Sequence, residues 1–294
     1  MSISSATVPV NRNSGLRRWP LAALLLAVLA GCSTGDHQPP INVVTVKSHD
    51  YAYEVNPEIP SGLTRFRLVN HGQEGHHMVV FHLPDTMSIA TFHRLMAGGA
   101  ASRNGIESLG GPEGHDGPLQ DSTVILPTVD DRVVMWLDPG RYMLACMIPV
   151  HGGDDFHIDR GMFHPLSVRK SGVARAEPDF DAVVTMQDHS FDLSAPLRPG
   201  RRTVKIVNTG TQEHNLLLDR LHPGRTREDY FSAPEWVGVA DYQGGIARMS
   251  PGRTAYLDVD IEPGAHIMTC VTRDPTSGRG HWELGMVLEF QVLP

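Results

Sequence analysis

The feature that most constrains this 294-residue chain is a loop that occurs twice. Cys146 is followed by a histidine eleven positions later and by a methionine five positions after that, and the same spacing begins again at Cys270. A glycine, Gly161 or Gly285, precedes the methionine in each copy. Thiolate, imidazole and thioether groups form a soft ligand set that favours copper over magnesium or calcium. The sequence therefore predicts a soft-metal site in each copy, with the rest of the chain as its scaffold.

The repeat extends well beyond these loops. In the later part of each half, the Asp-Pro-Gly at 138–140 recurs as Glu-Pro-Gly at 262–264, a displacement of 124 that also relates the two Cys-His-Gly-Met sets. Self-similarity at a fixed displacement indicates a duplicated structural unit. An earlier block recurs 138 positions later: Asp50, Gly62, Asn70, Gly72 and His76 match Asp188, Gly200, Asn208, Gly210 and His214.

Short apolar-alternating segments, broken by Gly, Pro and Asn, are typical of a β-sandwich. We therefore expect an all-β chain with two tandem Greek-key β-sandwich domains, residues 41–170 and 181–294, joined by a linker at 171–180. The sequence predicts a short helix over residues 88–97 and a loop over residues 110–118. The predicted strand segments are 41–55, 64–70 and 76–83 in the first half, and 181–193, 202–208 and 214–221 in the second.

The N-terminus has the pattern of an export signal. Arg17 and Arg18 precede a short apolar run at 21–30, too short to span a membrane permanently. Leu29-Ala30-Gly31-Cys32 resembles the bacterial lipobox, which implies a signal peptide at 1–31 and a lipidated Cys32. An ordinary signal peptide with an incidental cysteine is the alternative. In the lipoprotein interpretation, residues 32–40 are the lipidated cysteine and a polar tether, which anchor the body to a membrane in the periplasm or at the cell surface.

Charge and cysteine content narrow the function. Removal of residues 1–31 takes away three arginines and no acidic residue, so the net charge of −8 becomes −11. An acidic chain is unsuited to nucleic acid but is compatible with a basic redox partner. A disulfide between Cys146 and Cys270 is conceivable in an exported protein. It would not explain why the same histidine and methionine follow both cysteines.

A second histidine completes each candidate site. The motif N-x-G-x3-H occurs at 70–76 and at 208–214, where an Asn-Gly turn ends one strand and brings the histidine to the start of the next. Each cysteine follows another predicted strand. In a sandwich these two strand ends can lie side by side, so we expect the ligands to converge at one end of each domain.

Together, the N-x-G-x3-H motif, the Pro-Gly strand before the cysteine and the C-x10-H-x4-M loop resemble the cupredoxin family of blue copper proteins. The resemblance covers nearly all of residues 41–294, in two copies. It implies a type 1 site in each domain, in which two histidines and a cysteine surround copper and a methionine is a distant axial ligand. The implied ligands, for up to two coppers per chain, are His76, Cys146, His157 and Met162, and His214, Cys270, His281 and Met286.

Two features of the histidines leave alternatives open. His151 lies five positions after Cys146 and competes with His157 as the loop ligand, although His281 and the spacing to the methionine favour His157. The first half also has surplus histidines, which allow a second, type 2-like metal site: His71, His77, His82 and His164. The resemblance further implies that the loop histidine turns its ring edge to solvent and serves as the port for electrons.

The leading functional hypothesis is one-electron transfer with a redox partner such as a cytochrome or a copper oxidase. The alternatives are storage or delivery of copper in the cell envelope and a copper-free structural sandwich. Two-domain nitrite reductases and laccases place a histidine beside the cysteine, whereas Cys146 and Cys270 have none beside them. The sequence therefore predicts that the chain is not an enzyme and has no catalytic residues.

Overall fold

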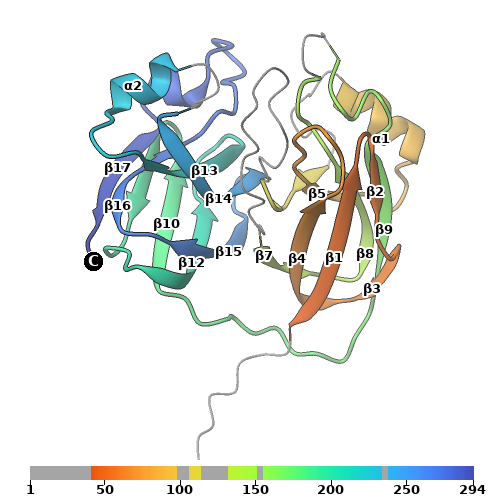
Figure 1. Cartoon of the computed structure of the whole chain (residues 1–294). Coiled ribbons are helices and arrows are strands. Elements are labelled where there is room, and N and C mark those ends of the chain that lie inside the picture. The colour runs from red at the N-terminus through yellow and green to blue at the C-terminus, as the bar shows by residue number, and fades with distance from the viewer. Residues whose placement is uncertain (1–40, 98–105, 114–131, 151–154, 234–237) are drawn as a thin grey trace, which may run out of the picture. The chain divides into compact units, whose positions relative to one another are not determined.

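The computed structural model describes residues 41–97, 106–113, 132–150, 155–233 and 238–294. The predicted signal peptide (1–31) and the tether with Cys32 (32–40) lie outside the described residues. Residues 38–294 form one compact unit, and Figure 1 shows that its described part consists mainly of strands. In that part, no helix is long and apolar enough to cross a bilayer.

The first half follows the predicted order of strands and helix. The helix expected at 88–97 is confirmed as α1. The Ser88 side chain caps its N-terminus by accepting a hydrogen bond from the Thr91 backbone N–H (3.0 Å), and Phe92 and Met96 form its buried face. The elements are β1 (Asn42–His49), β2 (Ala52–Glu54), β3 (Glu58–Pro60), β4 (Gly62–Asn70), β5 (Val79–Leu83), α1 (Ile89–Met96), β6 (Glu107–Ser108), β7 (Arg132–Leu137), β8 (Gly140–Ala145) and β9 (Phe163–Arg169).

The second half repeats this order. Before its last strand it has a short 3-10 helix, η3, that carries the loop histidine His281. Its elements are β10 (Ala182–Gln187), β11 (Ser190–Leu193), β12 (Gly200–Asn208), β13 (His214–Leu221), α2 (Arg227–Ser232), β14 (Ala240–Met249), β15 (Thr254–Ile261), β16 (Gly264–Thr269), η3 (His281–Leu284) and β17 (Val287–Val292).

The strands of the described residues form three sheets, and each half is a sandwich. An eight-stranded sheet has the order β11-β10-β12-β15-β7-β4-β1-β2, so the second half supplies its first four strands and the first half its last four. The other layer of the first half is the sheet β3-β9-β8-β5-β6, and that of the second half is β14-β13-β16-β17. The predicted fold class, all-β with two β-sandwiches, is confirmed by this topology.

Alternation along the strands explains the layers. In β1, the side chains of Val44 and Val46 point into the core, whereas the side chain of Val43, on the opposite face of the strand, is 64% exposed. Their counterparts 138 positions later in β10, Ala182 and Val184, are buried in the same way. Successive side chains of a strand point to opposite faces, so every second residue packs between the two sheets of its half. The parallel pairings of β1 with β4 and of β10 with β12 also match.

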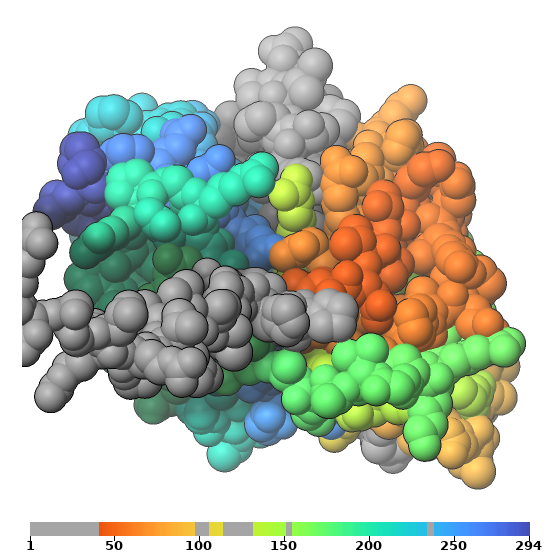
Figure 2. Space-filling model, turned by 90° about the horizontal axis from the view of Figure 1, so that it is seen from below, coloured from red at the N-terminus to blue at the C-terminus, as the bar shows by residue number. Residues whose placement is uncertain are grey.

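The two halves join through equivalent strands. In the pairing of β7 with β15, Val133 lies opposite Leu257, which is its own counterpart in the 124-residue displacement. An ion pair between Arg65 Nε and Asp258 Oδ2 (2.8 Å) adds to this contact. The residues between the halves, 171–180, contain no strand or helix, and 172–177 are exposed, as Figure 2 shows for the green surface segment.

A second connection is made by residues 106–113, here called the junction segment. On one side its carbonyls at Gly110 and Pro112 accept hydrogen bonds from Val80 and Met78 (both 2.9 Å), and on the other side Ala247 N–H donates to the Gly111 carbonyl (2.8 Å). The loop predicted at 110–118 is confirmed for 110–113, which belong to no strand or helix, and 114–118 lie outside the described residues. This loop runs between two strands, where Gly110 and Gly111 adopt the positive φ angles that glycine allows.

A buried carboxylate in β13 predicts pH-dependent stability. Asp219 accepts a hydrogen bond from the Tyr230 hydroxyl (2.7 Å), and burial raises the pKa of Asp219 to about 7 from an ordinary 3.8. The folded chain thus holds this proton more tightly than the unfolded chain. The stabilisation is complete below about pH 4 and is lost as the pH rises towards 7, by as much as about 4 kcal/mol.

The comparison of wild type with Asp219→Asn checks this expectation. Asparagine is neutral and can still accept the Tyr230 hydrogen bond, so the variant should be the more stable protein at pH 8 and close to wild type at pH 4. Denaturant unfolding at both pH values measures the difference. An equal difference at pH 4 and pH 8 would show that Asp219 does not titrate in this range.

Candidate metal centres

Two groups of buried side chains bring metal-ligating atoms together. They are His76, Cys146 and His157 in the first half, here called site 1, and His214, Cys270 and His281 in the second half, here called site 2. In each group the ligand atoms lie within 4.8 Å of one another. All six side chains are at most 1% exposed.

In site 1, the His76 Nδ1 and His157 Nδ1 atoms are 3.1 Å apart, and Cys146 Sγ is 3.4 Å from His157 Nδ1. Atoms that share one ion at metal–nitrogen and metal–sulfur distances of about 2.0 to 2.3 Å lie roughly 3 to 4 Å from one another. The three atoms are therefore spaced for a single ion. The loop histidine in this group is His157, while His151 lies outside the described residues.

Site 2 has the same arrangement. The His214 Nδ1 and His281 Nδ1 atoms are 3.0 Å apart, and Cys270 Sγ lies 3.5 Å from His281 Nδ1 and 3.9 Å from His214 Nδ1. These distances again suit one ion of ordinary coordination radius. Two halves with different side chains around the ligands thus produce the same three-atom cluster.

Each methionine predicted as a ligand lies beside its cysteine. The Cys146 N–H donates a hydrogen bond to the Met162 carbonyl (3.0 Å), and the Cys270 N–H donates to the Met286 carbonyl (3.4 Å). Both methionines are fully buried. The strands β8 and β9, and β16 and β17, pair immediately after these contacts, so the sheet register fixes cysteine and methionine next to each other.

The histidine from the N-x-G-x3-H motif is oriented by an aspartate. His76 Nε2 lies 3.3 Å from Asp50 Oδ1, and His214 Nε2 lies 3.0 Å from Asp188 Oδ1. A carboxylate accepts only, so Nε2 carries the proton and Nδ1 is left with a free lone pair. Asp50 and Asp188 were recognised in the sequence as a repeated pair, but their role at the site was not predicted.

The loop histidine of each site contacts the residue that lies two positions before the histidine of the N-x-G-x3-H motif. His157 Nε2 lies 2.9 Å from Glu74 Oε2, and His281 Nε2 lies 3.0 Å from Gln212 Oε1. The expectation that this ring edge faces solvent is wrong, because His157 and His281 are 1% and 0% exposed. The Glu74 and Gln212 side chains cover the ring from outside and leave Nδ1 directed inwards.

Burial sets the protonation of the ligands. It lowers the pKa of His76 and of His281 to about 4, with the neighbouring histidine adding to the effect, so both imidazoles are neutral near pH 7. Burial also raises the pKa of Cys146 to about 12 and that of Cys270 to about 11. The thiols are therefore protonated without a metal, and a bound cation must displace their protons.

The residue that follows the motif's histidine organises the cysteine loop. In site 2, Asn215 Oδ1 accepts hydrogen bonds from the backbone N–H groups of Val271 and Thr272 (3.0 and 3.1 Å). In site 1 the equivalent residue is His77, whose Nε2 accepts from the Met147 N–H (2.7 Å). In the sequence His77 was placed among the surplus histidines, but its position one after His76 matches that of Asn215 and could have indicated this role.

The asparagine of the motif shapes the loop that carries the histidine. Asn70 Oδ1 accepts from the Gly72 N–H (2.8 Å), and Asn70 Nδ2 donates to the Glu74 carbonyl (2.8 Å). Asn208 makes the same two bonds in the second half, at 2.9 Å each. Asparagine favours such turns because its side chain imitates a backbone turn. The motif is thus a closed loop that presents its histidine at a fixed place.

The glycine of the motif is required by the histidine itself. A Cβ on Gly72 would lie 2.3 Å from Asp50 Oδ1 and 2.8 Å from His76 Nε2, and a Cβ on Gly210 would meet Asp188 and His214 at 2.4 and 2.8 Å. We therefore expect Gly72→Ala to displace the Asp50–His76 pair and to weaken copper binding at site 1 by about 10- to 100-fold. A competition titration with Cys270→Ser present would report on site 1 alone.

Gly75→Ala is the matched control in the same loop. A Cβ at Gly75 meets nothing within 4 Å, and its φ is not in the left-handed region. This variant should bind copper as the parent does. Equal binding by both alanine variants would show that the close approach of Gly72 to His76 has no bearing on the ligand.

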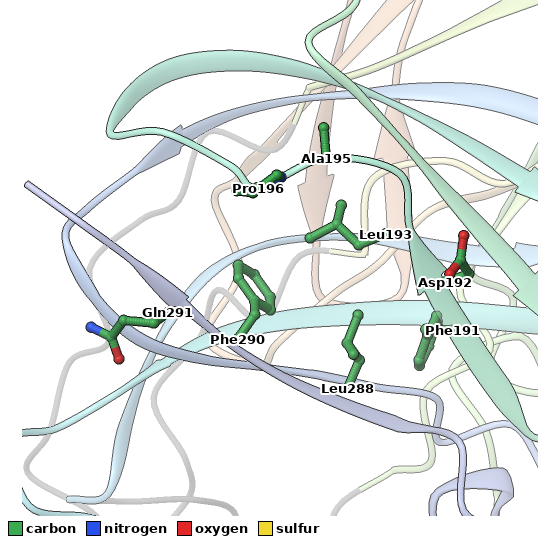
Figure 3. Close-up of a pocket in the computed structure, with 8 residues that line it drawn as sticks. All are labelled: Phe191, Asp192, Leu193, Ala195, Pro196, Leu288, Phe290 and Gln291. Atoms are coloured by element: carbon green, nitrogen blue, oxygen red, sulfur yellow. The ribbon is translucent and has the colours of Figure 1, made fainter.

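Other candidate groups are weaker. His189 and Asp274 form a third group with His281, which site 2 already uses. Among the described residues, the surplus histidines His71, His82 and His164 belong to no such group. A surface pocket lies between β11 and β17, and Figure 3 shows Leu193, Leu288 and Phe290 gathered around it. No residue of sites 1 and 2 lines it, the lining being Phe191, Asp192, Leu193, Ala195, Pro196, Leu288, Phe290 and Gln291.

Comparison with known proteins gives structural likeness only. No protein-family model and no curated protein matches the sequence. Similar solved structures include an auracyanin from the photosynthetic bacterium Roseiflexus castenholzii (16% identity, TM-score 0.29, covering 38% of this chain and 95% of that chain). A copper nitrite reductase from Nitrosomonas europaea (16%, 0.23, 86% and 93%) and a multicopper oxidase (12%, 0.24, 86% and 88%) are also similar.

These structures correct one prediction. The statement that the chain is not an enzyme is wrong, because the similar structures include a multicopper oxidase and copper nitrite reductases, which are enzymes. The absence of a histidine beside Cys146 and Cys270 does not exclude catalysis. A fold of this kind can hold its reaction centre at other residues, since activity depends on the site and not on the scaffold.

Proposed function

We propose that this chain binds one copper ion in each half and transfers electrons one at a time. The observation that carries the proposal is the pair of buried His-Cys-His clusters, each with a methionine beside the cysteine. The proposed ligands are His76, Cys146, His157 and Met162 in site 1, and His214, Cys270, His281 and Met286 in site 2.

The donor set fits copper. Two neutral imidazoles and a thiolate with a more distant thioether suit both the cuprous and the cupric ion, and copper bound there would supply one-electron chemistry. The chain contributes a fixed arrangement. Asp50 and Asp188 orient one histidine in each site, Glu74 and Gln212 cover the other, and burial keeps water from the ligand atoms.

The cellular setting is part of the same proposal. The N-terminal sequence supports export to the periplasm or cell surface and attachment to a membrane through a lipid on Cys32. The negative net charge supports a basic redox partner such as a cytochrome or copper oxidase. Storage or delivery of copper is the second reading, because a closed, buried site can also hold the metal without exchanging electrons.

The test begins with a visible absorption spectrum of the copper-loaded full-length chain and a count of copper per chain. Two coppers with an intense thiolate-to-copper band, followed by fast reduction by a cytochrome c, support electron transfer. Two coppers without the band, or a coloured protein that no redox protein reduces, would replace this function with copper storage. A chain that binds no copper would refute both.

A further inference from the structure

Glu113 lies at the end of the junction segment, between the two candidate sites, and is 5% exposed. Its Oε1 accepts a hydrogen bond from Asn215 Nδ2 (3.3 Å) in the second half. Its Oε2 lies 3.6 Å from His77 Nδ1 in the first half and has no hydrogen bond among the described residues. A buried carboxylate oxygen without a hydrogen bond is uncommon enough to require a reason.

The two residues that Glu113 contacts occupy the same position in the two halves. His77 follows the proposed ligand His76, and Asn215 follows the proposed ligand His214. Each also holds the cysteine loop of its own site, through Met147 N–H in site 1 and through Val271 N–H in site 2. Glu113 is thus one residue away from each cysteine loop.

The protonation of His77 makes the contact directional. Because His77 Nε2 accepts the hydrogen bond from the Met147 N–H, the ring proton is on Nδ1, which faces Glu113. The Asn215 side chain is oriented in the same way. Its oxygen is used by the loop at Val271 and lies 3.2 Å from Cys270 Sγ, so its N–H₂ group is directed at the carboxylate. Both neighbours therefore present donors to Glu113.

The charge of Glu113 reaches both thiols. Burial is the largest cause of the raised pKa of Cys146 and of Cys270, and the negative charge of Glu113 raises both further. A single carboxylate that acts on two cysteines from two halves of the chain is in a position to influence any cation bound at either one.

The surrounding backbone leaves Glu113 little freedom. The preceding residue, Pro112, accepts the Met78 N–H bond at 2.9 Å and bridges to Ile246 of β14. A Cβ on Gly245 would lie 2.9 Å from the Glu113 Cβ, so the second half approaches this residue closely. Met78 of the first half and β14 of the second half thus hold the backbone at Glu113 from both sides.

We propose that Glu113 is a positioning residue shared by the two copper sites, and that it acts on site 1 through its charge and His77 and on site 2 through its charge and Asn215. The inference depends on the proposed function, since it requires copper at both sites. The carboxylate stabilises the more positive cupric form at each site. Its removal should therefore make both sites easier to reduce, which no residue belonging to one site alone would do.

The experiment measures the reduction equilibrium of each site against a common mediator by its visible band. Cys270→Ser leaves site 1 to be read, and Cys146→Ser leaves site 2. In both backgrounds Glu113→Gln should shift the equilibrium towards the reduced form by about fivefold or more, equivalent to about 40 mV for one electron. Glu113→Asp keeps the negative charge. Its reduction equilibrium should therefore differ from that of the parent by no more than half of the Glu113→Gln shift, on a logarithmic scale.

Two control variants separate the shared role of Glu113 from a general loosening of the junction segment. Glu74→Gln removes a carboxylate that contacts the site 1 loop histidine and the Tyr51 hydroxyl, so it should shift site 1 and leave site 2 unchanged. Glu107 is also in the junction segment, where it forms an ion pair with Arg253 and does not contact His77 or Asn215. Glu107→Gln breaks this ion pair and should shift neither site. Thermal unfolding of every variant shows whether it is folded.

The outcomes are distinct. A shift at both sites with Glu113→Gln, but not with Glu107→Gln, supports the shared role of Glu113. A shift at one site only, at neither site, or equally with Glu107→Gln overturns it while the two bound coppers leave the proposed function intact. Absence of copper from the parent chain would refute the proposed function itself, and is recognised before any Glu113 variant is made.

Discussion

Replacement of Cys146 by serine is expected to remove one copper per chain and about half of the thiolate-to-copper absorption, because the sulfur is the soft donor that gives the band its intensity. Cys270→Ser should remove the other half, and the double variant should be colourless. Serine is close to cysteine in size, and both thiols are fully buried without a disulfide, so folding should be little affected. Copper analysis and visible spectra of the three variants measure the effect.

Cys32→Ser is the control for these variants, because it changes the third cysteine of the chain and no proposed copper ligand. Its spectrum should equal that of the parent. A band that survives in the double variant would show that neither Cys146 nor Cys270 is the sulfur ligand. A band lost entirely with one single variant would show that only that half holds copper.

Gly111→Ala is expected to give the largest loss of stability of any single substitution considered. A Cβ at this position would lie 2.0 Å from the Met78 carbonyl oxygen, and the glycine has φ +144°. Neither group can move freely, because Met78 and the junction segment are hydrogen-bonded to each other through Pro112. We expect the free energy of unfolding to fall by about 4 kcal/mol or more, measured by denaturant titration of the metal-free protein.

Gly252→Ala isolates the contribution of backbone conformation. Gly252 also has a positive φ (+76°), but a Cβ there meets nothing within 4 Å. The variant should lose only about 1 to 2 kcal/mol, the ordinary penalty for an L-residue in the left-handed region. Similar losses in the two variants would mean that the junction segment yields to the added methyl group.

Much of the candidate site could be predicted because its residues repeat. The spacing from Cys146 to His157, and again from Cys270 to His281, survives duplication, and the structure brings each pair together with the histidine of the N-x-G motif. The strands were predictable for a related reason. Alternation in β1 and β10 reflects one buried face, which a sequence displays locally.

The residues that sequence reasoning missed depend on long-range contacts. Glu113 acts on Asn215, 102 positions away, and no repeated motif marks it. His77 was hidden because its counterpart is Asn215, a different residue type that accepts the same kind of hydrogen bond from the loop. The exposure of the loop histidine was mispredicted because its cover, Glu74 or Gln212, comes from another strand connection. Such contacts follow from tertiary packing and not from local spacing.

The pairing of Val133 with its own counterpart Leu257 has a consequence for how such a chain could arise. An interface in which equivalent strands lie antiparallel is self-complementary, as in a symmetric dimer of identical subunits. Either half produced alone would expose β7 or β15 as an unpaired edge, and such edges recruit another strand. A separated half should therefore associate with a second copy of itself. The present chain corresponds to that dimer with its two subunits fused into a single gene product.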